Sequence, residues 1–169
     1  QLREEWGEAA DRRMLGFFLV QALAALLLSL AFLLPALRPD SPGLLALMLA
    51  VLVWLLAVIG EAVADAQLRR FVADPAHRGR VCDVGLWRYS RHPNYFFECL
   101  HWLAYVPLAL GAPWGWLTLL PPVFMAWLLV KVSGIPLLEQ HLARSRPGYA
   151  DYVRRTSMLI PWPPRKEND

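Results

Sequence analysis

Charged residues are scarce in this chain. They make up 18% of its 169 residues, against about 25% in ordinary soluble proteins, and 57% of the residues are hydrophobic. Residues 14–34 and 43–59 hold no charged side chain. So high an apolar content excludes intrinsic disorder, and two cysteines are too few for a disulfide-stapled domain. A soluble single domain is excluded too, because apolar runs of this length are typical of membrane-spanning helices.

The apolar runs predict an all-α fold, a polytopic transmembrane bundle with about four spans. Span one covers residues 14–34 and is closed by Pro35, and span two covers 43–59 and continues as a helix to residue 71. Span three, 96–110, is short. Span four, 114–133, contains Pro121 and Pro122, and we expect these to kink it because proline lacks a backbone N–H.

The segments outside the spans are polar and basic. A loop at residues 72–95 and a basic amphipathic C-terminal helix after Lys131 are predicted to lie at the membrane surface. Residues 1–13 form a charged lead-in. We expect residues 1–169 to be a single membrane domain and the C-terminal part of a longer chain.

Lysine and arginine are distributed very unevenly over the two sides of this arrangement. Of 17 such residues, only Arg38 lies in a connector on the far side. Since cytoplasmic loops carry the excess of Lys and Arg, residues 63–95 and 131–169 are predicted to be cytoplasmic, in an integral multi-pass protein of the bacterial inner membrane. Trp87 and Tyr152 are expected in the aromatic belt on that side, and Cys82 and Cys99 are expected to be free thiols.

The most informative block is residues 85–98, where a surface loop leads into an apolar helix. It contains Arg88, Arg91 and His92, followed by Asn94 and Glu98. Anchoring to lipid phosphates explains the arginines but not the amide and the acid. An acid inside a span is costly and indicates function, and an asparagine offers donors and an acceptor that suit a carboxamide or a base edge.

Two further groups flank this block. Glu61 and Asp65 are four residues apart and share one helical face, where they bind either a ligand with donors or nearby arginines such as Arg80. Two carboxylates without a histidine at ligand spacing are poor evidence for a metal site. In the tail, Glu139 and His141 precede a run of arginines, for which surface anchoring is favoured over ligand binding.

Together these groups predict a site for a phosphorylated nucleotide. Arginines bind phosphate bidentately, acids suit ribose hydroxyls and an asparagine suits an amide. A lipophilic second substrate would arrive from the membrane lipids, and no nucleic-acid partner is expected. The chain has no glycine-rich dinucleotide fingerprint after a strand, so a Rossmann domain is excluded.

At these residues the sequence resembles the membrane steroid 5-alpha-reductase family, whose wider superfamily includes the sterol C14 reductases and the isoprenylcysteine carboxyl methyltransferases. The resemblance implies a helical bundle that binds NADPH from the cytoplasmic side and reduces a carbon-carbon double bond, in the best-known branch the one conjugated to the 3-ketone of a steroid. The matching residues are Gly60, Glu61, 64–67, 85–95, Glu98, Trp102, 139–141, Tyr149, Tyr152 and Pro161.

The resemblance also implies roles for individual residues. Asn94 would contact the nicotinamide carboxamide, with Tyr95 and Glu98 beside it. The acid and tyrosine that hold the substrate ketone would belong to helices upstream of this chain, so no catalytic residue is assigned. Phe97 stands where the family often has glycine and would crowd the nicotinamide. The remaining cofactor-binding residues that it implies are Glu61, Asp65, Arg80, Arg88, Arg91, His92, Glu139 and His141.

Two other functions compete with reduction. A methyltransferase of the superfamily would share the Arg-His-Pro-x-Tyr block but would use S-adenosylmethionine, which carries no phosphate and does not need the pair Asn94 and Glu98. A non-enzymatic scaffold would use its basic face to hold anionic lipid headgroups, each Lys or Arg contributing about 1 kcal/mol. The Asn–Glu pair and the excess of arginine favour the reductase.

Overall fold

The computed structural model describes residues 10–38, 40–132 and 134–165, so the charged lead-in up to residue 9 lies outside it. The described residues are mostly helical and contain no β-strand. The long helices are α2 (Ala10–Leu28), α4 (Leu44–Ala73), α5 (Pro93–Leu103) and α8 (Ile135–Ser145). The shorter elements are α3 (Leu30–Ala36), α6 (Val106–Ala109), α7 (Leu120–Trp127), α9 (Tyr149–Arg155), the 3-10 turns Pro75–His77, Gly85–Arg88 and Gly115–Leu119, and the π-helical turn Leu128–Val132.

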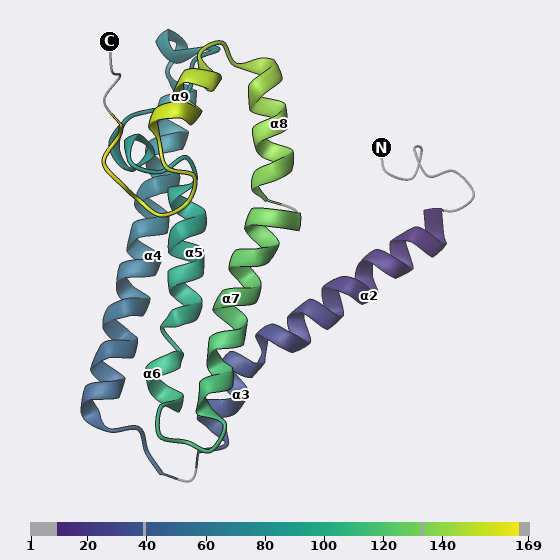
Figure 1. Cartoon of the computed structure of the whole chain (residues 1–169), viewed down its shortest axis with the longest axis vertical. Coiled ribbons are helices and arrows are strands. Elements are labelled where there is room, and N and C mark those ends of the chain that lie inside the picture. The colour runs from purple at the N-terminus through teal and green to yellow at the C-terminus, as the bar shows by residue number, and fades with distance from the viewer. Residues whose placement is uncertain (1–9, 39, 133, 166–169) are drawn as a thin grey trace.

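Helices α4, α5 and α7 lie side by side along the long axis (Figure 1). Helix α6 continues α5 toward one end of the bundle, and α8 continues the direction of α7 toward the other (Figure 1). The predicted amphipathic tail helix therefore runs along the bundle rather than across its end. Helix α2 leans away from the bundle, and only its C-terminal part lies near α3 and α7 (Figure 1).

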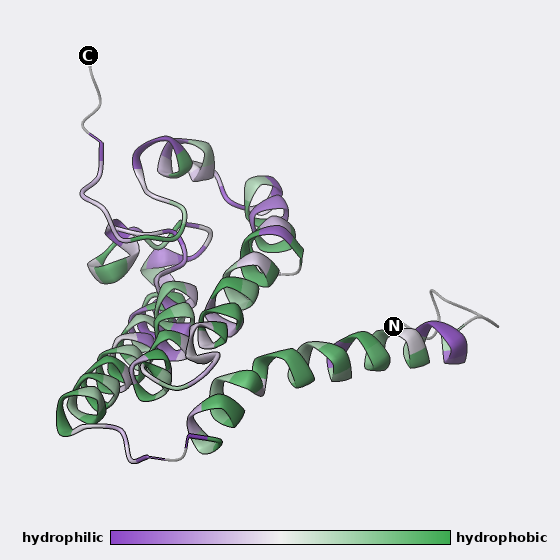
Figure 2. Cartoon of the chain, turned by 60° about the horizontal axis from the view of Figure 1, so that its bottom comes forward, coloured by the Kyte–Doolittle hydropathy of each residue, from purple (hydrophilic) through white to green (hydrophobic). Residues whose placement is uncertain are grey.

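The predicted class, a helical membrane bundle, is confirmed. Within the described residues, three stretches are long and apolar enough to cross a membrane: Ala10–Ala36, Leu44–Ala73 and Gly115–Ser145. The ribbon is coloured hydrophobic over most of α2 and α4, whereas α8 is largely hydrophilic (Figure 2). Many apolar side chains of α2 and α4 are exposed. The predicted third span corresponds to α5 and α6, which begin at Pro93 rather than at residue 96 and are interrupted between Leu103 and Val106.

The prolines act differently from the prediction. Pro35 does not close the first helix, because α3 includes it and ends at Ala36. Pro121 and Pro122 do not kink the middle of a helix; they lie in the first turn of α7, directly after a 3-10 turn. In a first turn the missing N–H groups have no intrahelical acceptor to lose, so the prolines are tolerated there.

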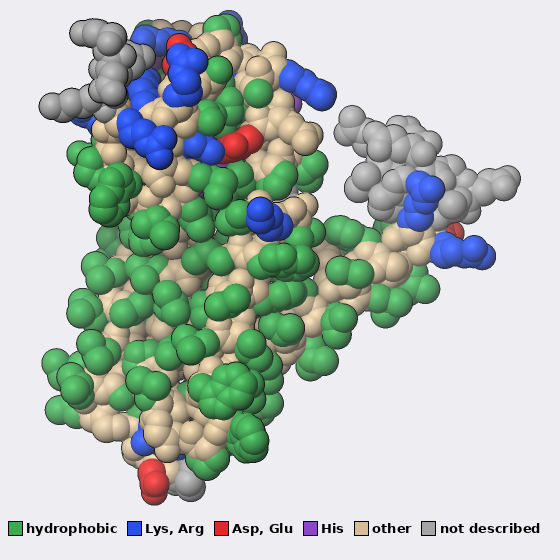
Figure 3. Space-filling view, in the orientation of Figure 1, with side chains coloured by type: hydrophobic (Ala, Val, Ile, Leu, Met, Phe, Trp, Pro, Cys, Tyr) green, Lys and Arg blue, Asp and Glu red, His purple; other side chains and the backbone are tan. Residues whose placement is uncertain are grey.

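The two ends of the bundle differ in charge (Figure 3). Arginines gather over the loop and α9 at one end, which we call the basic end. Arg38 lies at the opposite end, where its Nη1 donates to the backbone oxygens of Leu110 (2.9 Å) and Leu108 (3.3 Å). The one far-side arginine thus satisfies carbonyl groups where α6 ends.

Candidate functional site

A cluster of polar side chains lies where α4 and α5 pack together near the basic end. Asn94, in the first turn of α5, donates from Nδ2 to Oδ1 of Asp65 on α4 at 3.3 Å. Glu98, one turn later, accepts a hydrogen bond from Trp102 Nε1 at 3.0 Å. Glu61, one turn before Asp65, interacts electrostatically with both Glu98 and Asp65. The structure therefore brings together Glu61, Asp65, Asn94 and Glu98, all of which are half-buried.

A close approach of the two helices makes this cluster possible. The ring of Phe97 lies against Gly60, where a Cβ atom would overlap three of its ring atoms. Glycine is therefore required on α4 for α5 to pack so closely. Because Phe97 and Gly60 directly precede Glu98 and Glu61, their contact sets the separation of the two acids.

The second group of predicted residues forms an ion-pair cluster around Glu139 on α8. Its Oε1 accepts from Arg91 Nε at 2.8 Å and from His92 Nε2 at 2.9 Å, and Oε2 lies 3.4 Å from Arg91 Nη2. The His92 side chain is only 2% exposed. Burial lowers the pKa of His92 below its ordinary value, against an opposing effect of Glu139, so the imidazole is neutral and Nε2 carries the proton toward the carboxylate.

Tyr149 adds a buried phenol beside this cluster. Its hydroxyl has no hydrogen-bond partner among the described residues. Burial, and next the negative charge of Glu139, raise the pKa of Tyr149. The phenol of Tyr149 therefore stays neutral beside the cluster.

The C-terminal segment holds the central loop in place. Arg91 Nη1 donates to the backbone oxygens of Thr156 (2.9 Å) and Val153 (3.2 Å), and the Arg91 N–H donates to Ser157 O (2.8 Å). Ser90 Oγ donates to Leu159 O at 2.8 Å. This segment fixes the corner that immediately precedes Asn94.

Two aromatic residues extend the same support to α4. Tyr152 donates its hydroxyl to the backbone oxygen of Trp87 at 2.5 Å, and Trp87 Nε1 donates to the backbone oxygen of Ala64 at 2.9 Å. The prediction of an aromatic belt is wrong for both, because they are 3% and 7% exposed. Sequence reasoning missed this role because a buried and an interfacial aromatic look alike in a single sequence.

The other predicted residues lie apart from the cluster or at its edge. Tyr95 stacks on His92 with ring centroids 5.5 Å apart. Arg88 and His141 are exposed, and neither side chain makes a hydrogen bond within the described part of the chain. No group of three histidine, cysteine or acidic residues among the described positions could hold a metal ion.

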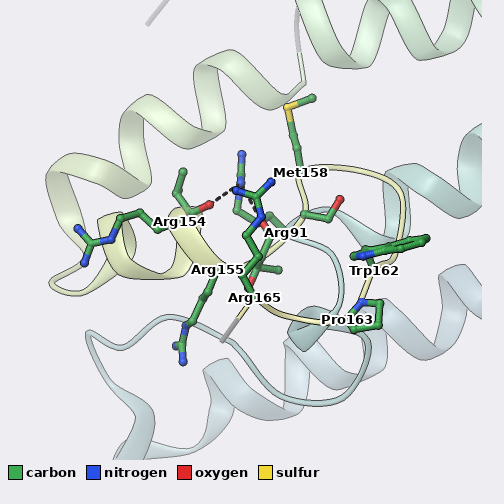
Figure 4. A pocket seen from close by; sticks show the side chains of 10 residues that line it. Arg91, Arg154, Arg155, Met158, Trp162, Pro163 and Arg165 are labelled. Atoms are coloured by element: carbon green, nitrogen blue, oxygen red, sulfur yellow. Dashed lines mark hydrogen bonds between the residues drawn. The ribbon is translucent and has the colours of Figure 1, made fainter. Parts of the chain in front are cut away.

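A hollow of about 450 Å³ lies over the C-terminal segment. Arg91 forms its inner wall, Arg154 extends to one side, and Trp162 and Pro163 border the opposite side (Figure 4). Most of its arginines are already paired: Arg155 with Asp83 at 2.7 Å, Arg154 with Asp151, and Arg91 with Glu139. The hollow therefore offers less positive charge than its arginines suggest.

A family model described as "Protein of unknown function (DUF1295)" matches residues 1–156. The chain belongs to the DUF1295 family. This family is part of the steroid 5-alpha-reductase superfamily, so the resemblance of the motifs is confirmed at the level of the superfamily. No curated protein and no solved structure matches this DUF1295 chain.

Proposed function

We propose that this DUF1295 protein is an NADPH-dependent membrane reductase. It would reduce the conjugated carbon-carbon double bond of a lipophilic enone, with 3-oxo-4-ene steroids as the expected substrates. The observation that carries the proposal is the Asn94 amide, held between Asp65 and the start of α5 and flanked by Glu61 and Glu98. A dinucleotide would offer its carboxamide to the amide and its ribose hydroxyls to the acids.

The residues present fit the cofactor. Asn94 Nδ2 gives one hydrogen to Asp65, and Oδ1 accepts the Tyr95 N–H at 3.1 Å. One N–H and one lone pair of the amide are left for a carboxamide. The carboxylates of Glu61 and Asp65 are acceptors suited to ribose hydroxyls, and their mutual repulsion falls when such donors bind.

When bound, NADPH supplies the hydride. The chain's own residues then orient the nicotinamide through Asn94 and hold that side chain through Asp65. The ring of Phe97 packs against Gly60, the residue before Glu61. The exposed surface of α4 is apolar over most of its length. A lipophilic substrate can reach such a site from the membrane.

The test is enone-dependent oxidation of NADPH by the purified protein in lipid nanodiscs, followed by absorbance with a 3-oxo-4-ene steroid as substrate. Asn94→Ala should lower kcat/KM at least tenfold, because the amide's hydrogen bonds position the reacting carbon. Gln140→Ala, an exposed change on α8, is the matched control. Near-normal turnover by the Asn94 variant would contradict the assignment, as would stabilisation of the protein by S-adenosylmethionine and not by NADPH.

A further inference from the structure

An apolar chamber of about 230 Å³ lies between the end of α4 and α8. Its walls include Leu68 and Phe71 from α4, Leu142 from α8, and the aromatic side chains of Trp87 and Tyr152. Aromatic and aliphatic walls of this kind suit a flat, mainly apolar ring system. The cluster around Asn94 and Asp65 does not use this chamber.

A basic hollow of about 510 Å³ adjoins the chamber, and the two share Phe71, Val72, Arg80 and Arg146 as walls. Arg78 also lines it. Asp74 is the one acid in its lining; its Oδ1 accepts the Ala76 N–H at 2.9 Å, and its Oδ2 lies 3.3 Å from His77 Nδ1.

The arginines of this hollow are available to a ligand. Within the described residues the side chains of Arg78, Arg80 and Arg146 make no ion pair and no hydrogen bond. They differ in this from the arginines of the hollow in Figure 4, which are mostly paired. Three unpaired guanidinium groups beside an apolar chamber form a site for an anion attached to a ring system.

Both cavities are lined by residues of α4 that follow the cluster that we assign to the nicotinamide. From Glu61 to Phe71, α4 rises about 15 Å at 1.5 Å per residue. Asp65 and Leu68 lie along this length, so α4 alone leads from the acids to the chamber. The chamber therefore begins about one helical turn beyond Asp65 on the same helix.

We propose that the chamber holds the adenosine end of the dinucleotide and that Arg78, Arg80 and Arg146 bind its 2′-phosphate. This inference rests on the proposed function. A phosphomonoester carries a charge of about −2 near neutral pH, and arginine forks bind it bidentately. Since NADH lacks this phosphate, the hollow determines specificity for NADPH. Arg80 was predicted from the sequence as a cofactor residue, whereas Arg78 and Arg146 come from the structure.

The first experiment compares NADPH and NADH on the full chain in nanodiscs, with dissociation constants from isothermal titration. Arg80→Ala and Arg146→Ala should each weaken NADPH about tenfold or more, as expected for a lost charge-assisted hydrogen bond, and leave the affinity for NADH unchanged. The control is Arg144→Ala, an exposed arginine that lines neither cavity. It should leave the affinity for both dinucleotides unchanged.

A second experiment separates the chamber from the hollow. Leu142→Trp fills the chamber and should lower the affinities for NADPH and NADH by the same factor. The arginine variants, by contrast, should lower the affinity for NADPH alone and so change the ratio of the two affinities. Adenosine 2′,5′-bisphosphate should compete with NADPH at least tenfold better than adenosine 5′-monophosphate, and Arg146→Ala should abolish that advantage.

The outcomes separate this inference from the proposed function. If NADPH binds and Asn94→Ala weakens it, but the arginine variants leave the NADPH-to-NADH ratio unchanged, the inference is overturned and the reductase assignment stands. If the arginine variants lose binding to phosphatidylglycerol vesicles while that ratio is preserved, the hollow binds lipid headgroups and the inference is likewise overturned. Failure of the wild-type protein to bind either dinucleotide would overturn both.

Discussion

Arg91 and Glu139, 48 positions apart in the sequence, are joined by two hydrogen bonds, from Nε to Oε1 at 2.8 Å and from Nη2 to Oε2 at 3.4 Å. The Arg91 side chain is 9% exposed, so this pair is largely removed from solvent. The pair fastens the loop before α5 to α8. His92 shares the same carboxylate oxygen, so two groups, a guanidinium and an imidazole, depend on one acid.

Removal of that acid should be costly. Glu139→Ala leaves the guanidinium of Arg91 buried without its counter-charge, and breaking a buried pair in this way costs about 3–5 kcal/mol. We expect a large fall in the midpoint of thermal unfolding in detergent. Asp151→Asn is the control, because its pair with Arg154 is exposed and worth at most about 1 kcal/mol. Equal shifts for the two variants would show that the buried pair contributes no more to stability than the exposed pair.

The same cluster predicts a dependence of stability on pH. Burial holds the pKa of His92 below the ordinary value of 6.5 in the folded protein, so the unfolded chain takes up the proton first as the pH falls. The contribution of His92 to the free energy of unfolding is complete above about pH 6.5. It is lost as the pH falls toward the pKa of His92 in the folded protein. Thermal midpoints measured from about pH 8 to about pH 5 should therefore fall less steeply for His92→Gln, which keeps a donor toward Glu139 but does not titrate. If the thermal midpoints of the wild type and of His92→Gln fell in parallel with pH, His92 would not be the group responsible.

The sequence predicts the helices well because they depend on local composition. The unbroken apolar run and the charged extension after it place one helix from the Gly43 turn to Phe71, and α4 spans Leu44–Ala73. The family resemblance names Asp65 and Asn94 as cofactor residues, but their hydrogen bond to each other is known only from the structure. Helix-type changes are harder to predict. Pro121 and Pro122 were expected to kink a helix, yet they begin one, because an upstream 3-10 turn takes up the change.

Contacts between distant segments were not predictable in the same way. Nothing local in the sequence indicates that Glu139 is shared by Arg91 and His92, or that Arg146 stands beside Arg80 at one hollow. Both relationships depend on how α8 and the C-terminal segment pack on the loop. Charge patterns identify which residues face water or lipid, but they do not identify which arginines find a partner.

The contact between Gly60 and Phe97 gives a third prediction. Gly60→Ala places a methyl group inside the Phe97 ring, and such overpacking costs about 1–3 kcal/mol. Phe97→Val should restore most of that loss in the double variant, which a double-mutant cycle on thermal midpoints measures. Gly16→Ala is the control on α2, where nothing lies within 4 Å of the added Cβ and alanine favours the helix. Additive effects of the Gly60 and Phe97 changes would show that the two side chains do not compete for space.

Tyr149 and Tyr152 lie three residues apart on α9, are 4% and 3% exposed, and differ in their hydroxyl groups. The Tyr152 hydroxyl donates to the backbone oxygen of Trp87. Tyr152→Phe removes this donor from a buried carbonyl and should lower the free energy of unfolding by about 1–3 kcal/mol. The Tyr149 hydroxyl has no partner among the described residues, so Tyr149→Phe removes an unsatisfied buried group and should be neutral or stabilising. Each variant keeps the ring and its packing, so thermal midpoints of the two compare the hydroxyl groups alone. A larger loss for Tyr149→Phe than for Tyr152→Phe would mean that the Tyr149 hydroxyl bonds Glu139 or Arg91 in solution, and the ion-pair cluster would then include a fourth member.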